Sequence, residues 1–113
     1  MSPITTHVLD TSRGRPASGI EIVLQVRSGH DWKELGKGLT DANGRCNTLM
    51  AENEIIESGT YRLLFGIGAY YHALHTETFY AEIPIVFELL HPEAHYHVPL
   101  LISPFGYSTY RGS

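Results

Sequence analysis

The sequence has little cysteine and little lysine, and each scarcity excludes a class of protein. Its 113 residues include one cysteine, Cys46, which excludes an internal disulfide framework and a CxxC metal or redox site. Lys33 and Lys37 are the only lysines. With 8 Lys+Arg against 12 Asp+Glu, the formal charge is −4 and no basic cluster forms. We therefore expect neither nucleic acid nor an anionic membrane as a partner.

Long hydrophobic runs are also missing. The longest apolar stretches, Ile83–Phe87 and Val98–Ile102, are far shorter than the ~20 residues of a membrane-spanning helix. The first four residues, Met1–Ile4, have neither the basic start nor the apolar core of a signal peptide. The composition is 42% hydrophobic, enough to bury a core. We expect a single cytoplasmic domain over residues 1–113.

Short alternating segments dominate the chain and predict an all-β fold. Asn43-Gly44 suits a turn with positive φ, and a two-turn helix is predicted at Ala69–His75. Seven or eight short strands with regular turns are typical of an antiparallel β-sandwich. The predicted strands are Ile4–Asp10, Ile20–Val26, Trp32–Leu39, Arg45–Met50, Thr60–Ile67, Ile83–Leu90, Tyr96–Ser103 and Gly106–Tyr110, while Glu52–Ser58 is either one helical turn or a loop.

Histidine is abundant, with 7 residues, and its side chain titrates near neutral pH. In a strand, His95 and His97 share one face and Tyr96 takes the other. Two imidazoles on one face can share a metal, one can orient the other, or both can simply face solvent. A metal requires a third ligand, from His7 or a carboxylate, and nothing in the sequence shows that convergence.

Other chemically interesting residues also have ordinary interpretations. A strand histidine such as His7 is commonly structural, and an arginine after a turn, such as Arg45, is commonly exposed. The polar C-terminal segment is typical of a frayed end. Neither Ser108 nor Ser113 lies in a G-x-S-x-G elbow, which argues against a covalent serine mechanism.

Taken together, segments along the whole chain resemble the signatures of the transthyretin-related proteins. The family usually has proline where Ala81 stands. The matching segments are Ile4–Asp10 with Gly14–Ala17, Thr40–Arg45, Phe79–Ile83, His95–Ser103 and the terminal Tyr110-Arg111-Gly112-Ser113.

This resemblance implies an enzyme. Hormone-carrying transthyretins lack the terminal tetrapeptide and have replaced the site histidines and arginine. The 5-hydroxyisourate hydrolases of urate breakdown keep them, as does this sequence with His7, Arg45, His97 and Tyr110–Ser113. The implied fold is a transthyretin-like sandwich of two four-stranded sheets with one short helix. The implied assembly is a homotetramer, a dimer of dimers, with active sites in the channel between dimers.

The resemblance also implies residue roles. His7, Arg45, His97 and Ser113 are the expected catalytic residues, with His97 as general base and His7 as its partner. His7, Arg45, Tyr110 and Arg111 are the expected substrate-binding residues for 5-hydroxyisourate, and neither a metal nor a cofactor is expected. Two alternatives stay open: a small-molecule carrier of the transthyretin kind, and a zinc amidohydrolase of another specificity.

Overall fold

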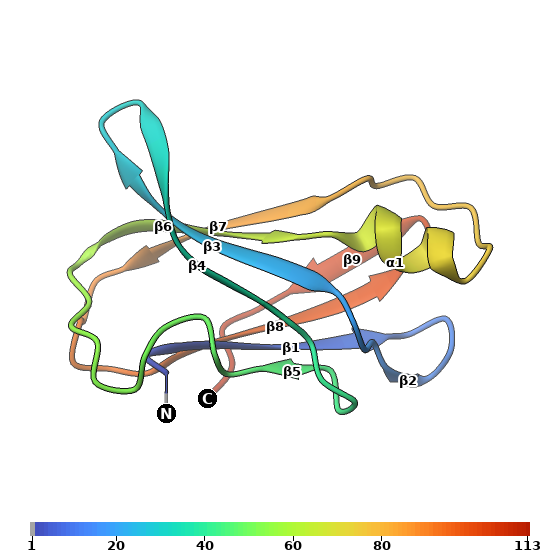
Figure 1. Cartoon of the computed structure of the whole chain (residues 1–113), viewed down its shortest axis with the longest axis horizontal. Helices are drawn as coiled ribbons and strands as arrows, with labels where there is room; N and C mark the ends of the chain where they lie inside the picture. Colours follow the sequence, from blue (N-terminus) through green and yellow to red (C-terminus); the bar gives the residue numbers. More distant parts are fainter. Residues whose placement is uncertain (1) are drawn as a thin grey trace.

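Two β-sheets pack face to face in the structure, a computed structural model that describes residues 2–113 (Figure 1). One sheet has the strand order β2-β1-β8-β9, with β5 as a further partner of β1, and the other has the order β4-β3-β6-β7. The elements are β1 (Ile4–Asp10), β2 (Arg15–Pro16), β3 (Glu21–Ser28), β4 (Asp31–Leu39), β5 (Arg45–Cys46), β6 (Gly59–Phe65), α1 (Ile67–Ala73), β7 (Ile83–Leu89), β8 (Tyr96–Ser103) and β9 (Gly106–Thr109).

The predicted sandwich is confirmed, with two differences in its sheets. The prediction of antiparallel pairing throughout is wrong for β1 and β8, which run parallel over seven residue pairs, from Ile4↔Tyr96 to Asp10↔Ile102. These strands are far apart in the sequence, so no hairpin forces them to be antiparallel. In addition, the short β2 and β5 share one edge of β1, which makes the first sheet five-stranded.

The core lies between the sheets and follows the period-2 alternation of the strands. In β3, Ile22 and Leu24 are fully buried and pair with Phe65 and Leu63 of β6. In β8, Leu100 and Ile102 face them from the other sheet and are also fully buried. Such alternation fixes register, because a one-residue slip would turn every apolar side chain to the solvent.

The helix begins two residues earlier than predicted. Its buried residues are Ile67, Tyr70 and Tyr71, at the i, i+3, i+4 spacing of one helical face, whereas Ala69 and His72 are exposed. The predicted range, Ala69–His75, was therefore based on residues that lie on the solvent-exposed face of the helix. Among residues 2–113, no helix is long and apolar enough to cross a membrane. The cytoplasmic location stays a prediction.

A buried carboxylate ties the helix to β1. Asp10 is 0% exposed, and its Oδ1 accepts hydrogen bonds from the Tyr71 hydroxyl at 3.0 Å and the Ser12 hydroxyl at 2.6 Å. Its Oδ2 accepts one from the Tyr70 hydroxyl at 2.9 Å. Burial raises the pKa of Asp10, but hydrogen bonds from Ser12, Tyr70 and Tyr71 outweigh it and hold the pKa below 3.8.

We predict that Asp10→Asn lowers the free energy of unfolding by about 1–3 kcal/mol, because an amide NH₂ cannot accept the bonds that the second carboxylate oxygen accepts. Since the folded-state pKa of Asp10 is lowered, its contribution is present above pH 3.8 and is lost as the pH falls through the lowered value. Urea unfolding at pH 7 measures the difference. Asp31→Asn, at an exposed position, is the control. Equal losses in both variants would contradict the role of Asp10.

Candidate active site

Three strands bring the predicted catalytic residues His7, Arg45 and His97 together on the outer face of the five-stranded sheet. On β1, Thr5 and His7 point away from the core side that Thr6 and Val8 occupy. His7 lies opposite Arg45 of β5, and Thr5 lies opposite His97 of β8. Segments about 40 and 90 residues downstream therefore flank the same strand.

The turn before β5 determines where Arg45 lies. Gly44 has φ = +76°, as predicted for Asn43-Gly44, and its carbonyl accepts a 2.8 Å hydrogen bond from the Val8 N–H. The carboxylate of Asp41 accepts bonds from the backbone N–H groups of Asn43 at 2.9 Å and Arg45 at 3.0 Å. A Cβ at Gly44 would collide with the Val8 carbonyl, so glycine allows this turn to contact β1.

The side chains border a shallow hollow of about 180 Å³. The sequence analysis did not assign Thr5 or Asn47 to the site. Thr5 could have been found from strand alternation, which places its side chain on the same face of the strand as His7. The hollow is lined by Thr5, Arg45, Asn47, His95, His97 and Ser113.

A threonine hydroxyl joins the two histidines of the His95-Tyr96-His97 segment. The Oγ1 of Thr5 lies 2.8 Å from Nδ1 of His97 and 3.1 Å from Nε2 of His95. The two rings are nearly parallel, with 6.5 Å between their centroids. Both imidazoles thus direct a nitrogen at the hydroxyl.

The end of the chain packs directly on His97. The Gly112 N–H donates a 2.8 Å hydrogen bond to the His97 carbonyl. A Cβ on Gly112 would lie 2.8 Å from Cδ2 of His97, closer than Cβ atoms normally approach, and 3.0 Å from Cγ of Pro99, which is also tight. Glycine therefore lets the backbone lie against the imidazole and places Ser113 beside the hollow.

The surroundings of His97 favour its neutral form. Burial is the largest cause that lowers the pKa of His97 below 6.5, followed by electrostatic interactions with Arg45, His95 and His7. At pH 7 the imidazole therefore carries a free lone pair, as a general base requires. A guanidinium nearby offers donors for a developing oxyanion.

Comparison with known proteins matches nearly the whole chain to one protein family. The model of the HIUase/transthyretin family covers residues 4–112. The chain belongs to this family.

The curated relatives include proteins named 5-hydroxyisourate hydrolase. The 5-hydroxyisourate hydrolase of Salmonella typhi is 43% identical over 110 residues, which cover 97% of this chain and 80% of the relative. That of Mus musculus is 41% identical over 114 residues, covering 99% and 96%. The protein is a hydrolase of the HIUase/transthyretin family.

Solved structures confirm the predicted transthyretin-like fold. The 5-hydroxyisourate hydrolase of Klebsiella pneumoniae superposes with a TM-score of 0.87 and 36% identity, covering 100% of both chains. Sea bream transthyretin in complex with thyroxine superposes with a TM-score of 0.90 and 31% identity, covering 97% of this chain and 94% of that one.

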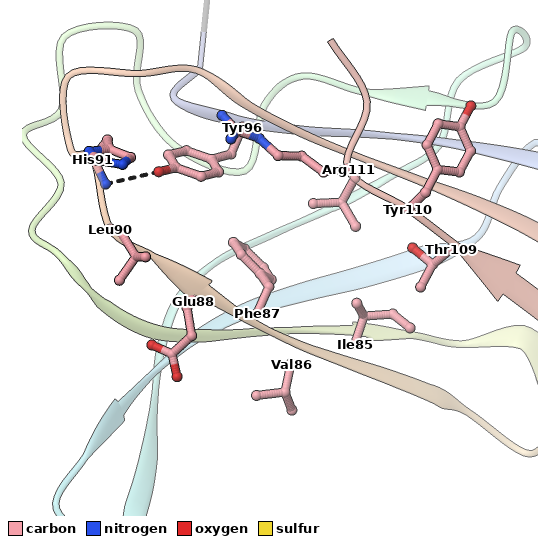
Figure 2. Close-up of a pocket in the computed structure, with 11 residues that line it drawn as sticks. Ile85, Val86, Phe87, Glu88, Leu90, His91, Tyr96, Thr109, Tyr110 and Arg111 are labelled. Atoms are coloured by element: carbon pink, nitrogen blue, oxygen red, sulfur yellow. Dashed lines mark hydrogen bonds between the residues drawn. The ribbon is translucent and has the colours of Figure 1, made fainter.

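Two predicted substrate-binding residues of this family member, Tyr110 and Arg111, lie outside the hollow that His95 and His97 line. Tyr110 and Arg111 border a separate, mostly apolar hollow of about 380 Å³, whose opposite wall is β7 (Figure 2). The Arg111 guanidinium stacks 4.4 Å from the centre of the Tyr96 ring, on the other side of β8 from His97. Within one chain the structure brings together His7, Arg45, His97 and Ser113, whereas Tyr110 and Arg111 lie elsewhere. The catalytic and substrate-binding roles of these residues stay predictions.

The described residues form no cluster of three metal ligands, and the Cys46 side chain is buried. In the part of the chain that the structure describes, no three His, Cys, Asp or Glu side chains converge as metal ligands. Cys46 is 2% exposed and pairs with Thr6, whose side chain faces the core. Its thiol is therefore directed away from the hollow.

We predict that Arg45→Gln raises the pKa of His97, because it removes a positive charge that disfavours the imidazolium. An NMR pH titration of the imidazole Cε1–H resonances measures this pKa without any substrate. Arg27→Gln, on the other sheet, is the matched control and leaves the His97 pKa unchanged. An unchanged pKa in Arg45→Gln would contradict the electrostatic coupling of the two residues.

Proposed function

We propose that this protein hydrolyses 5-hydroxyisourate to 2-oxo-4-hydroxy-4-carboxy-5-ureidoimidazoline in urate degradation. The observation that carries the proposal is the hollow that brings together Arg45, His97 and Ser113, with His7 beside Arg45. Relatives that carry the name of this enzyme, 41–43% identical over nearly the whole chain, support the choice of substrate.

In the proposed reaction, water opens the six-membered ring at an amide bond, with no metal or cofactor. His97 takes a proton from water as the oxygen adds to the carbonyl carbon. Arg45 stabilises the negative charge that develops on the carbonyl oxygen. When the carbon–nitrogen bond breaks, the proton returns to the leaving nitrogen through the histidines, with His7 as the partner of His97. Ser113 positions substrate or water.

We further propose that the site is completed in a homotetramer, a dimer of dimers. A hollow of about 180 Å³ is small for a ligand site, since such sites commonly enclose about 300–1,000 Å³. β7 and β9 are free sheet edges with exposed apolar side chains, including Val86 and Tyr107. Free edges of this kind favour association between subunits. A subunit facing the hollow would enclose the substrate and supply Tyr110 or Arg111.

The decisive experiment follows the ultraviolet decay of 5-hydroxyisourate, made freshly from urate by urate oxidase, with and without the protein. Circular dichroism of the product then reports its stereochemistry. We expect faster decay and one optically active product. Decay at the spontaneous rate would contradict the proposed function and would favour a carrier like sea bream transthyretin, whose structure contains thyroxine.

We predict that His97→Asn lowers kcat by about 10²–10⁴-fold with little change in KM, because it removes the base but keeps a polar side chain of similar reach. His72→Asn, at an exposed position of α1, is the control and keeps full activity. Near-normal kcat in His97→Asn would contradict the assignment of the base.

We predict that Gly112→Ala lowers kcat/KM by about 10–100-fold while the sandwich stays folded, because the added methyl displaces the His97 ring or Ser113. Gly106→Ala is the matched control, since its Cβ would make an ordinary 3.7 Å contact with Ser103. Activity assays and circular dichroism separate the two effects. Unchanged activity, or unfolding of Gly112→Ala alone, would contradict a role in positioning the site.

A further inference from the structure

The Thr5 hydroxyl is buried between two imidazoles, and this constrains its proton. Thr5 is 3% exposed, and among the described residues its hydroxyl partners are Nδ1 of His97 and Nε2 of His95. A hydroxyl has one proton to donate, so it cannot donate to both nitrogens. For both contacts to be hydrogen bonds, at least one of the two imidazoles must therefore carry a proton on the nitrogen that faces Thr5.

The role of His97 as a base selects one direction for this chain of hydrogen bonds. Nδ1 of His97 is engaged by Thr5, so Nε2 is the nitrogen left to take a proton from water. A lone pair on Nε2 requires the proton to sit on Nδ1 and be donated to Thr5 Oγ1. The Thr5 hydroxyl then donates to Nε2 of His95, which is exposed to solvent.

We infer that Thr5 is a positioning residue that holds His97 in its Nδ1–H form, and that His95 is the solvent-side end of a proton relay. The inference rests on the proposed function and deepens it. When Nε2 of His97 takes a proton from water, the Nδ1 proton passes to Thr5 and the Thr5 proton passes to His95. His97 is then neutral with its proton on Nε2, ready for the leaving nitrogen. The reverse transfer from His95 restores the starting state.

The charges around His97 make this relay useful. Arg45 of β5, the neighbouring His95 and His7 of β1 all disfavour an imidazolium at the position of His97. Asp41, in the turn before β5, interacts electrostatically with Arg45 and His7, and its carboxylate accepts bonds from the Asn43 and Arg45 backbone. Moving the positive charge to His95, which is exposed in the single chain, takes it off the more buried His97 ring, where burial disfavours it most. The histidine next to the substrate can then act as base and acid without remaining charged.

The first test needs no substrate. Long-range ¹H–¹⁵N NMR spectra of the imidazoles report which nitrogen carries the proton at pH 8. We expect His97 as the Nδ1–H form in the wild type and in Thr5→Ser, and a mixture of forms in Thr5→Val. An Nε2–H form of His97 in the wild type, or no difference in Thr5→Val, would overturn the inference, whatever the substrate.

The second test measures kinetics. Thr5→Val lowers kcat by about 10²-fold with KM nearly unchanged, and Thr5→Ser restores most of it, because serine keeps the hydroxyl. In His95→Ala, added imidazole buffer raises kcat by replacing the missing proton acceptor, whereas the wild type and the control His30→Ala, in the exposed β3–β4 turn, do not respond. Circular dichroism confirms that each variant is folded.

The outcomes separate the inference from the proposed function. A wild type that does not accelerate the decay of 5-hydroxyisourate contradicts the function, and the NMR test still decides the His97 form. An active wild type with full kcat in Thr5→Val, or without buffer response in His95→Ala, overturns the relay alone.

Discussion

The parallel pairing of β1 with β8 is the contact on which the remaining structure depends. It joins residues about 90 positions apart over seven residue pairs and fixes two faces at once. On the inner face it places Val8 beside Leu100, both fully buried. On the outer face the same register places Thr5 beside His97. Burial of the inner face sets this register, since a slip by one residue would expose the apolar side chains. The site geometry is thus held by the hydrophobic core.

Much of the fold was predictable from the sequence because its determinants are local. Period-2 alternation located β3 and β8, and the Asn43-Gly44 pair located the turn with positive φ. The direction of β1 relative to β8 was not predictable, because pairing of distant strands leaves no local pattern. The predicted helix began two residues too late because Ala69, His72 and Ala73 also share one helical face. Only packing against the sheets shows that the buried residues include Ile67 and Tyr71.

The candidate site was predictable in its residue types more than in its contacts. Because His95 and His97 are two positions apart, the prediction that both imidazoles share one face was correct. His97 lies in β8, and His95 immediately precedes the strand. That Thr5 lies between them follows from the β1–β8 register, which no motif contains. Tyr110 and Arg111 show the opposite case: the motif places them next to Ser113, yet beyond the end of β9 the Arg111 side chain lies on the Tyr96 ring. Neighbours in sequence therefore belong to different surfaces of one chain.

Strand β1 combines two tasks along its short length. Its last residue, Asp10, anchors the helix through Tyr70 and Tyr71, while Thr5 and His7 contribute to the outer face and Ile4 and Val8 to the core. A substitution in this strand therefore changes folding and chemistry together, and selection on either one constrains the other. The outer face of the opposite sheet, which carries Trp32 between Arg27 and Arg62, lies outside this coupling. A change at Trp32 therefore leaves the β1–β8 pairing, and with it the geometry of the hollow within one chain, intact.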